Sequence, residues 1–372
     1  MTQIGNISSA VKRAAREAGF ELAGIAPVCG FPELERFPEW IAEGRAGEMK
    51  YMEARDEAGR LKRALPNSAF PWARSVVVCA INYNTTQPYS TEFEDSREGW
   101  ISRYAWSRED YHEVVMRRLR EVEGKLKEEI SASNARTEPA LSLSKGVSTA
   151  HSELQTRCYV DTGPLVERVY AKYAGIGWIG KNTCILNQKL GSWLFLGVIL
   201  TSLELEPDLP APDRCGTCTR CIEACPTDAF VGPYQLDATR CISYLTIEKR
   251  GAIPEEMREG MGRHVFGCDI CQDVCPWNRK SPATAAAEFQ PREGLVNPAL
   301  ERLAQISEEE FRERFRRSPI RRAKRSGLRR NAVIAMGNSG RADFVPALEK
   351  LADDEDPVVA AHAQWAKRKL RS

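Results

Sequence analysis

The 372-residue sequence predicts an α+β protein made of three parts. Helix and strand signals are mixed over residues 1–205, eight of the twelve cysteines are crowded into residues 206–285, and apolar residues recur at helical spacing in residues 286–372. A chain of this length exceeds the size at which single hydrophobic cores stop growing. We therefore expect an α+β domain, a small cysteine-dense module and a helical domain, divided at these boundaries.

The first part has signals for both kinds of element. Residues 11–20 have helical spacing, and residues 75–84, SVVVCAINYN, have the composition of a buried strand. A long helix is predicted over residues 110–130, and residues 192–205 favour a strand or hairpin. Residues 131–154 are rich in Ser, Ala and Thr without periodicity, which predicts a flexible surface insertion.

Positive charge is concentrated in one segment of the chain. The formal net charge is +2, but residues 311–330 hold ten Lys or Arg against one Glu. The first residues show neither an apolar run of signal-peptide length nor a twin-arginine pair, and no run of ~18 apolar residues occurs. We expect a cytoplasmic protein without a membrane span, in which tightly spaced cysteines are metal ligands rather than disulfides.

The cysteine spacing predicts two iron–sulfur clusters. Residues 215–226 read CxxCxxCxxxCP, the ligand run of bacterial two-cluster ferredoxins, and residues 268–276 read CxxCxxxCP after a lone cysteine at position 241. Zinc ribbons or a disulfide framework are the alternatives, but separated CxxC pairs are the commoner zinc pattern. Because the cysteine before proline ligates the other cluster in such ferredoxins, one [4Fe-4S] set is expected from Cys215, Cys218, Cys221 and Cys275, and the other from Cys225, Cys241, Cys268 and Cys271. The cysteines that lack such spacing are expected to be buried apolar residues: Cys29, Cys79, Cys158 and Cys184.

Two other motifs match known signatures only in part. GIGWIGKN at 175–182 satisfies GxGxxG, but a nucleotide site needs a preceding strand and a following helix, and a helical stretch precedes it instead. Its glycines are expected to allow close approach of the backbone. DYHEVV at 110–115 begins like the DxHxxG signature of a lower axial histidine for cobalamin, but Val115 replaces the glycine. His112 is therefore expected to be a packing or hydrogen-bonding residue.

Asp161 has two interpretations that the residues alone leave open. It follows a strand-like stretch and precedes Gly-Pro and a helical segment, so it is a candidate N-cap. A buried carboxylate at this place could instead have a raised pKa and serve as a proton donor.

Four stretches around the cysteine runs resemble one enzyme family. They are ISRYAWSREDYH at 101–112, VDTGPLVERVYAKYAGIGWIGKNT at 160–183, CISYLTIEKRG at 241–251 and GCDICQDVCPWN at 267–278. In this order and with these cluster spacings they resemble the epoxyqueuosine reductases, cobalamin-dependent enzymes of tRNA queuosine synthesis. The resemblance covers the chain from about residue 10 to 340, apart from the insertion. It implies a cobalamin-binding α/β domain related to the reductive dehalogenases, a ferredoxin-like module with two [4Fe-4S] clusters and a HEAT-like helical tail, in which DPVVAAHAQWAKRKL looks like one HEAT unit.

The resemblance also implies a reaction and its residues. The epoxide of epoxyqueuosine at the wobble position of tRNA is reduced to the cyclopentene of queuosine with loss of water, the last step of queuosine biosynthesis. The clusters would deliver electrons singly to cobalt, and Asp161 matches the family's proposed acid. The chain departs from the family at WSRE, 106–109, where a shorter turn with a glycine is expected. The cobalamin contacts that the matching motifs imply are Arg103, Tyr104, Asp161, Lys181, Asn182, Glu248 and Gln272.

The basic segment 311–330 then has a candidate partner. An excess of nine positive charges in twenty residues fits phosphate contacts along an RNA stem better than a solvated helix face. The modified base would have to be turned out of its stack to reach the cofactor. We expect tRNA contacts from Arg321, Arg322, Lys324 and Arg325, an external electron donor such as flavodoxin or ferredoxin, and a monomer.

Two other functions share parts of this pattern. A cobalamin reductase of a small molecule, like the reductive dehalogenases, would hold the same cofactors, but such enzymes usually carry an export signal and have no use for the basic segment. A ferredoxin-type electron carrier would need the clusters alone and would not bind cobalamin.

Overall fold

A four-stranded antiparallel sheet forms the centre of the first part. The computed structural model describes residues 3–64, 66–137 and 154–371. The strand order is β1-β2-β7-β4, and the register pairs Ile25 with Val77 and Val78 with Val198. The strands are β1 (Leu22–Pro27), β2 (Ser75–Asn82), β7 (Leu194–Thr201) and β4 (Thr156–Tyr159).

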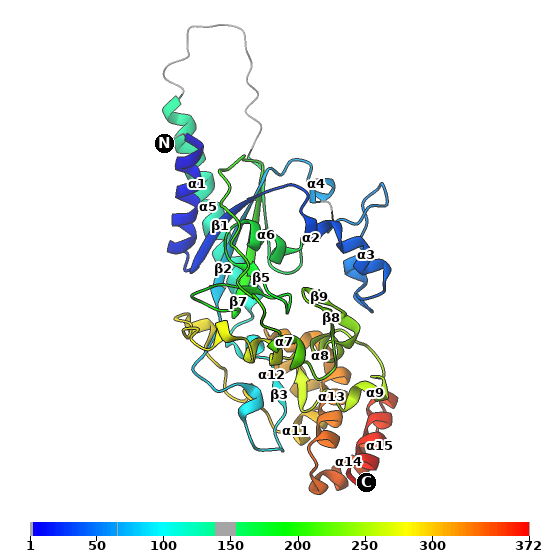
Figure 1. Cartoon of the computed structure of the whole chain (residues 1–372). Helices are drawn as coiled ribbons and strands as arrows, with labels where there is room; N and C mark the ends of the chain where they lie inside the picture. The colour runs from blue at the N-terminus through cyan, green and yellow to red at the C-terminus, as the bar shows by residue number, and fades with distance from the viewer. Residues whose placement is uncertain (1–2, 65, 138–153, 372) are drawn as a thin grey trace.

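Helices cover both faces of this sheet. Side chains alternate along a strand, so Val77 and Cys79 face α1 (Gln3–Glu17) and α5 (Tyr111–Thr137), while Val76 and Val78 face α6 (Glu167–Tyr173). Figure 1 shows α1 and α5 on one side and α6 on the other. Because both faces are covered, every residue of β2 is buried, which explains its unbroken apolar run. The α+β expectation is confirmed.

The predicted insertion at 131–154 falls mostly outside the described residues. Residues 131–137 form the last turns of α5, and residues 138–153 lie outside the part of the chain that the structure describes.

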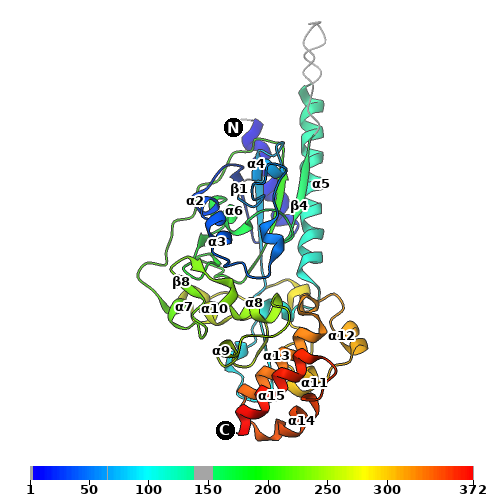
Figure 2. The ribbon, with the colours of Figure 1, turned by 90° about the vertical axis from the view of Figure 1, so that its right-hand side faces the viewer.

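The cysteine module lies between the sheet and the C-terminal helices (Figure 2). It takes one strand from the first part: β3 (Trp100–Ile101) pairs in parallel with β10 (His264–Phe266). Its other elements are α7 (Arg220–Glu223), β8 (Phe230–Gly232), β9 (Gln235–Leu236), α8 (Ile242–Ile247), α9 (Glu255–Arg258) and α10 (Ile270–Asp273).

The C-terminal helices share one hydrophobic core with this module. Ile242 and Phe266 belong to the same buried cluster as Leu328 and Val359, so the core continues across residue 285. Asn331 is fully buried and donates to the carbonyls of Thr246 and Val265, which ties the two parts together. The helices are α11 (Leu300–Ala304), α12 (Glu308–Arg314), α13 (Lys324–Asn338), α14 (Val345–Leu351) and α15 (Pro357–Arg371).

Within the described ranges, no helix has the length and apolar character needed to cross a membrane.

Short elements complete the fold. The short helices and strands are α2 (Pro32–Glu35), α3 (Phe37–Ala42), α4 (Pro66–Ala69), β5 (Trp178–Ile179) and β6 (Ile185–Leu186), with 3-10 turns that include η3 (Arg103–Trp106) and η8 (Pro319–Ala323).

Candidate functional site

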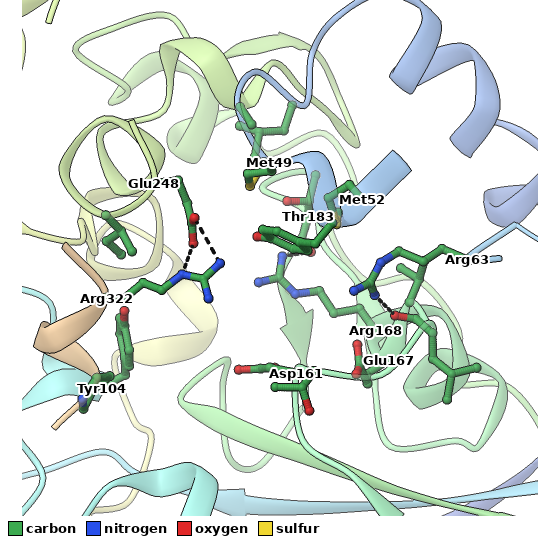
Figure 3. A pocket seen from close by; sticks show the side chains of 18 of the residues that line it. Met49, Met52, Arg63, Tyr104, Asp161, Glu167, Arg168, Thr183, Glu248 and Arg322 are labelled. Atoms are coloured by element: carbon green, nitrogen blue, oxygen red, sulfur yellow. Dashed lines mark hydrogen bonds and ion pairs between the residues drawn. The ribbon is translucent and has the colours of Figure 1, made fainter. Parts of the chain in front are cut away.

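A large cavity opens where the three parts of the chain meet. Its volume is about 2320 Å³, well above the roughly 300–1,000 Å³ of an ordinary small-molecule site. Its wall takes residues from α3 and the segment after it, the start of α5, the loop after β4, the end of α8 and the basic segment around η8. Figure 3 shows side chains from these separate elements pointing into one space. The cavity can hold a large ligand together with part of a second one.

Asp161 lies in this cavity on the loop that follows β4. Its φ of 58° is in the left-handed region, which a residue other than glycine seldom adopts. The Tyr111 hydroxyl donates to Asp161 Oδ2, and His112 Nε2 lies 3.8 Å from the same oxygen. The N-cap interpretation is wrong, because α6 begins at Glu167 with Val166 in the cap position. The Asp161 side chain is 53% exposed, so its carboxylate faces the cavity rather than the core.

Three charged residues beside Asp161 were not predicted from the sequence. Burial and the nearby Asp161 charge raise the pKa of Glu167 to about 7, and Glu167 Oε1 has no hydrogen-bond partner among the described residues. Arg63 donates to the Leu165 carbonyl at 2.6 Å, and Arg168 donates to the Thr183 carbonyl at 3.0 Å. Glu167 and Arg168 belong to the stretch 160–183 that carries the family resemblance. That resemblance was the sequence feature that could have pointed to them.

Tyr104 and Glu248, two of the expected cofactor contacts, also line the cavity. Glu248 forms a two-pronged ion pair with Arg322, with nitrogen–oxygen distances of 3.0 and 3.1 Å. The guanidinium of Arg322 lies 5.2 Å from the centre of the Tyr51 ring. Glu248 and Arg322 therefore join the expected cofactor wall to the expected RNA-binding segment (Figure 3).

Arg103 does not line the cavity. It is buried, donates to the carbonyls of Thr85 and Gln87 at 2.8 and 2.9 Å, and stacks at 4.9 Å on the Trp106 ring. Both Nη atoms of its guanidinium hold the chain segment that follows β2.

Lys181, Asn182 and Gln272 hold the cysteine loops instead of lining the cavity. Lys181 Nζ donates to the carbonyls of Gly216 and Cys218 at 2.7 and 3.0 Å. Asn182 donates to the Cys271 carbonyl at 3.2 Å, and Gln272 donates to Ser192 Oγ at 3.0 Å.

The glycine motif at 175–182 has no nucleotide-binding geometry. The strand β5 lies within it, β6 follows, and no helix starts there. Its glycines allow close packing as predicted: a Cβ on Gly177 would lie 2.1 Å from the Leu186 carbonyl oxygen, and one on Gly180 would lie 2.6 Å from Leu186 Cδ1.

Several of the motif cysteines that are far apart in the sequence lie near one another in space. Cys215 packs against Cys275 in a small cluster with Trp178 and Trp277, although sixty residues of chain separate the two thiols. Burial, followed by the charges of Cys215 and Cys221, raises the pKa of Cys275 to about 11. Cys215, Cys221 and Cys275 are three of the four members of the first predicted ligand set, which stays a prediction.

The second predicted set shows the same pattern. Burial raises the pKa of Cys241, and the Cys225 thiolate adds to the effect. Burial raises the pKa of Cys268 as well, with Cys241 contributing. Cys184 forms a hydrogen bond with Cys271, and this contact is the first cause of the raised pKa of Cys271. Thiols gathered in this way repel one another as thiolates, so they need the positive charge of iron to ionise together.

The fold and the site together define an iron–sulfur oxidoreductase with a large binding cavity beside its cysteine module. Residues 214–278 match the 4Fe-4S double cluster binding domain, which confirms the prediction of two [4Fe-4S] clusters. Residues 63–162 match the family described as Epoxyqueuosine reductase QueG, DUF1730.

Close relatives agree over nearly the whole chain. The epoxyqueuosine reductase of Xanthomonas campestris is 37% identical over 96% of this chain and 94% of its own length, and that of Pseudomonas aeruginosa is 38% identical over 98% and 94%. The chain therefore belongs to the epoxyqueuosine reductase family, oxidoreductases that complete queuosine biosynthesis in tRNA, as the sequence predicted.

Solved structures show the same fold. An epoxyqueuosine reductase crystallised with an epoxyqueuosine-modified tRNA-Tyr stem loop superposes with a TM-score of 0.84 at 30% identity, over 100% of this chain and 92% of that one. A Bacillus subtilis epoxyqueuosine reductase whose catalytic aspartate loop is swung out of the active site gives a TM-score of 0.82 at 31% identity, over 99% and 91%.

The ligand sets can be tested by iron content. Replacement of Cys241 in the Cys241→Ala variant should remove one cluster, so that reconstituted protein holds about four irons instead of about eight. Cys158→Ala is the matched control, because Cys158 lies on β4 away from the cluster loops and should leave the iron content unchanged. Full iron content in Cys241→Ala, measured by a colorimetric iron assay, would contradict the assignment.

Proposed function

We propose that this chain reduces the epoxide of epoxyqueuosine to the alkene of queuosine inside the cavity at Asp161, with cobalamin bound there and electrons supplied by the two clusters. The observation that carries the proposal is the position of Asp161. It faces a cavity bounded on one side by the cluster module and on another by the basic segment. An acid, an electron source and an RNA-binding surface thus meet at one place.

The residues present in the cavity fit cobalamin. Met49, Met52 and Ile179 give the wall apolar patches for a flat macrocycle, and Tyr104 and Glu248 give polar atoms for its amide side chains. Orphaned polar atoms point to a ligand as well: Glu167 Oε1, Arg63 Nε and Trp178 Nε1 belong to lining residues and lack partners in the described chain. When bound, cobalamin supplies a redox-active, nucleophilic cobalt centre.

The two cysteine groups suit stepwise electron delivery. Cys215 and Cys218 lie on an exposed loop among solvent-facing residues, which suits entry of electrons from an external donor such as flavodoxin or ferredoxin. Cys241 directly precedes α8, whose C-terminal end at Ile247 lines the cavity. Trp178, which packs against Cys275, also lines the cavity, so both clusters would stand beside it.

Asp161 is placed to give a proton to the oxygen of the opened epoxide. Asp161 lies on the loop after β4, not in a helix or strand, and accepts a hydrogen bond from Tyr111. A B. subtilis relative has a catalytic aspartate loop that can swing out of its active site. Both observations support the role of an acid that moves with its loop.

The substitution Asp161→Asn tests this role. It should lower the single-turnover rate of queuosine formation by ~100-fold or more, because general acid catalysis contributes about that much. The measurement is mass analysis of nucleosides after anaerobic incubation with epoxyqueuosine-containing tRNA. Iron content and tRNA affinity should not change. A rate within a few-fold of the unsubstituted protein would refute the role.

The four expected tRNA contacts lie together at the cavity. Arg321, Arg322, Lys324 and Arg325 all line it, and a relative has been crystallised with a tRNA stem loop. Arg322 is engaged with Glu248, and Arg325 Nε donates to the Ile306 carbonyl at 2.9 Å. Arg321 and Lys324 are exposed, which suits them best for phosphate contacts. The substrate base would be turned out of the stem loop into the cavity.

Salt dependence tests these contacts. The double variant Arg321→Gln/Lys324→Gln should bind tRNA more weakly and lower the slope of log K against log salt by about 1.5, since each phosphate contact contributes about 0.7–0.9. Arg13→Gln/Arg16→Gln is the matched control, because both arginines are exposed on α1, away from the cavity. An unchanged slope in the first variant would count against the proposed RNA surface.

The remaining expectations belong to the same proposal. We propose that α13, α14 and α15 are a HEAT-like unit that packs on the cluster module through the core they share. The three-part division of the chain, the kinship of its first domain with the reductive dehalogenases and the monomeric state are proposed on the strength of the sequence pattern.

A further inference from the structure

The reaction needs more protons than Asp161 holds. Conversion of an epoxide to an alkene and water consumes two electrons and two protons. The first proton goes to the oxygen when the first C–O bond breaks, and the second lets that oxygen leave as water when the second C–O bond breaks. The clusters supply the electrons, but one carboxyl group supplies one proton at a time. Asp161 must therefore be reloaded, or a second donor must act, before the second C–O bond breaks.

His112 stands next to Asp161 in a fixed orientation. Its Nδ1 lies 2.9 Å from Asp110 Oδ1, and its Nε2 lies 3.8 Å from Asp161 Oδ2. Asp110 is itself anchored, because the same oxygen accepts the backbone N–H of His112 at 3.0 Å in the manner of a helix N-cap. The His112 ring also stacks on Tyr111 with 4.0 Å between ring centres. A carboxylate on one ring nitrogen thus aims the other at the acid.

We propose that His112, oriented by Asp110, is the residue that returns a proton to Asp161 between the two C–O cleavages, an inference that rests on the proposed function. Tyr111 shares the Asp161 oxygen, but its buried hydroxyl has a pKa well above the ordinary value and keeps its proton. Glu167 lies nearby too, but its Oε1 is shielded from solvent. His112 is 37% exposed, so water can reload it after each transfer.

The charges around His112 favour its protonated form. Burial lowers its pKa, but the hydrogen bond and charge of Asp110, with the charge of Asp161, outweigh burial and leave the pKa raised above its ordinary value of 6.5. The positive charge of Arg322, on η8, lowers the pKa of His112 and so opposes this effect. Burial raises the pKa of Asp110, but its hydrogen bonds with His112, the His112 charge and, least, the Arg317 charge outweigh burial and leave that pKa lowered. A raised histidine pKa extends the pH range in which His112 is protonated, and the relay is lost as pH rises through the folded pKa.

The experiment uses the reconstituted protein with both clusters, cobalamin and epoxyqueuosine-containing tRNA. His112→Gln should lower the single-turnover rate by ~100-fold and abolish its alkaline decline. His112→Ala should recover rate with added imidazole, whereas Asp161→Asn should not. Asp110→Asn keeps an N-capping side chain but removes the charge, so the alkaline decline should move to lower pH.

A second readout does not depend on turnover. The chain has only four histidines, so NMR titration of histidine-labelled protein can follow the His112 ring. Its pKa should fall in Asp110→Asn. The inference is overturned if His112→Gln keeps the rate and pH profile of the unsubstituted protein, if imidazole restores nothing, or if the NMR titration is unchanged. Absence of queuosine with the unsubstituted protein would instead overturn the proposed function.

Discussion

A single buried carboxylate ties the electron-transfer module to the catalytic cavity. Asp269 lies between the cluster ligands Cys268 and Cys271, and it accepts hydrogen bonds from the Ser102 hydroxyl and, at 2.6 Å, from the backbone N–H of Arg103. Tyr104, the next residue, lines the cavity. Burial raises the pKa of Asp269, whereas its two hydrogen bonds lower it. The ionised form of this carboxylate is therefore stabilised by these two donors. The position of the loop that carries Cys268 and Cys271 relative to the cavity follows from this contact and from the β3–β10 pairing beside it.

The cavity wall then separates into two regions of different charge. Around Asp161 the wall mixes carboxylates and aromatic rings with Arg63, Arg168 and His112, whereas the ionisable groups of η8 and the start of α13 are cations, which suit phosphates. The Glu248–Arg322 pair joins the two regions. The Arg322 side chain is held by this pair, while Arg321 and Lys324 are exposed beside it.

Much of this arrangement could be predicted from local sequence. The composition of residues 75–84 predicted the strand β2, and the spacing of eight cysteines predicted the two clusters, while their crossed assignment stays a prediction. The contacts of Asp161 could not be predicted, because Tyr111 and Asp161 are fifty residues apart and no periodicity relates them. Lys181 and Asn182 were expected to contact the cofactor because they belong to a motif, yet their side chains hold the cluster loops. A motif indicates that a residue is important, but the direction in which its side chain points depends on tertiary packing.

The most direct test of the account is whether cobalamin and both clusters are needed together. Reconstituted protein would be incubated anaerobically with a strong reductant and an epoxyqueuosine-containing stem loop, with and without cobalamin, and the nucleosides analysed by mass. The account predicts about eight irons and one bound cobalt per chain, with queuosine formed only when cobalamin is present. Queuosine formed equally without cobalamin, or fully clustered protein that binds no cobalt, would contradict it.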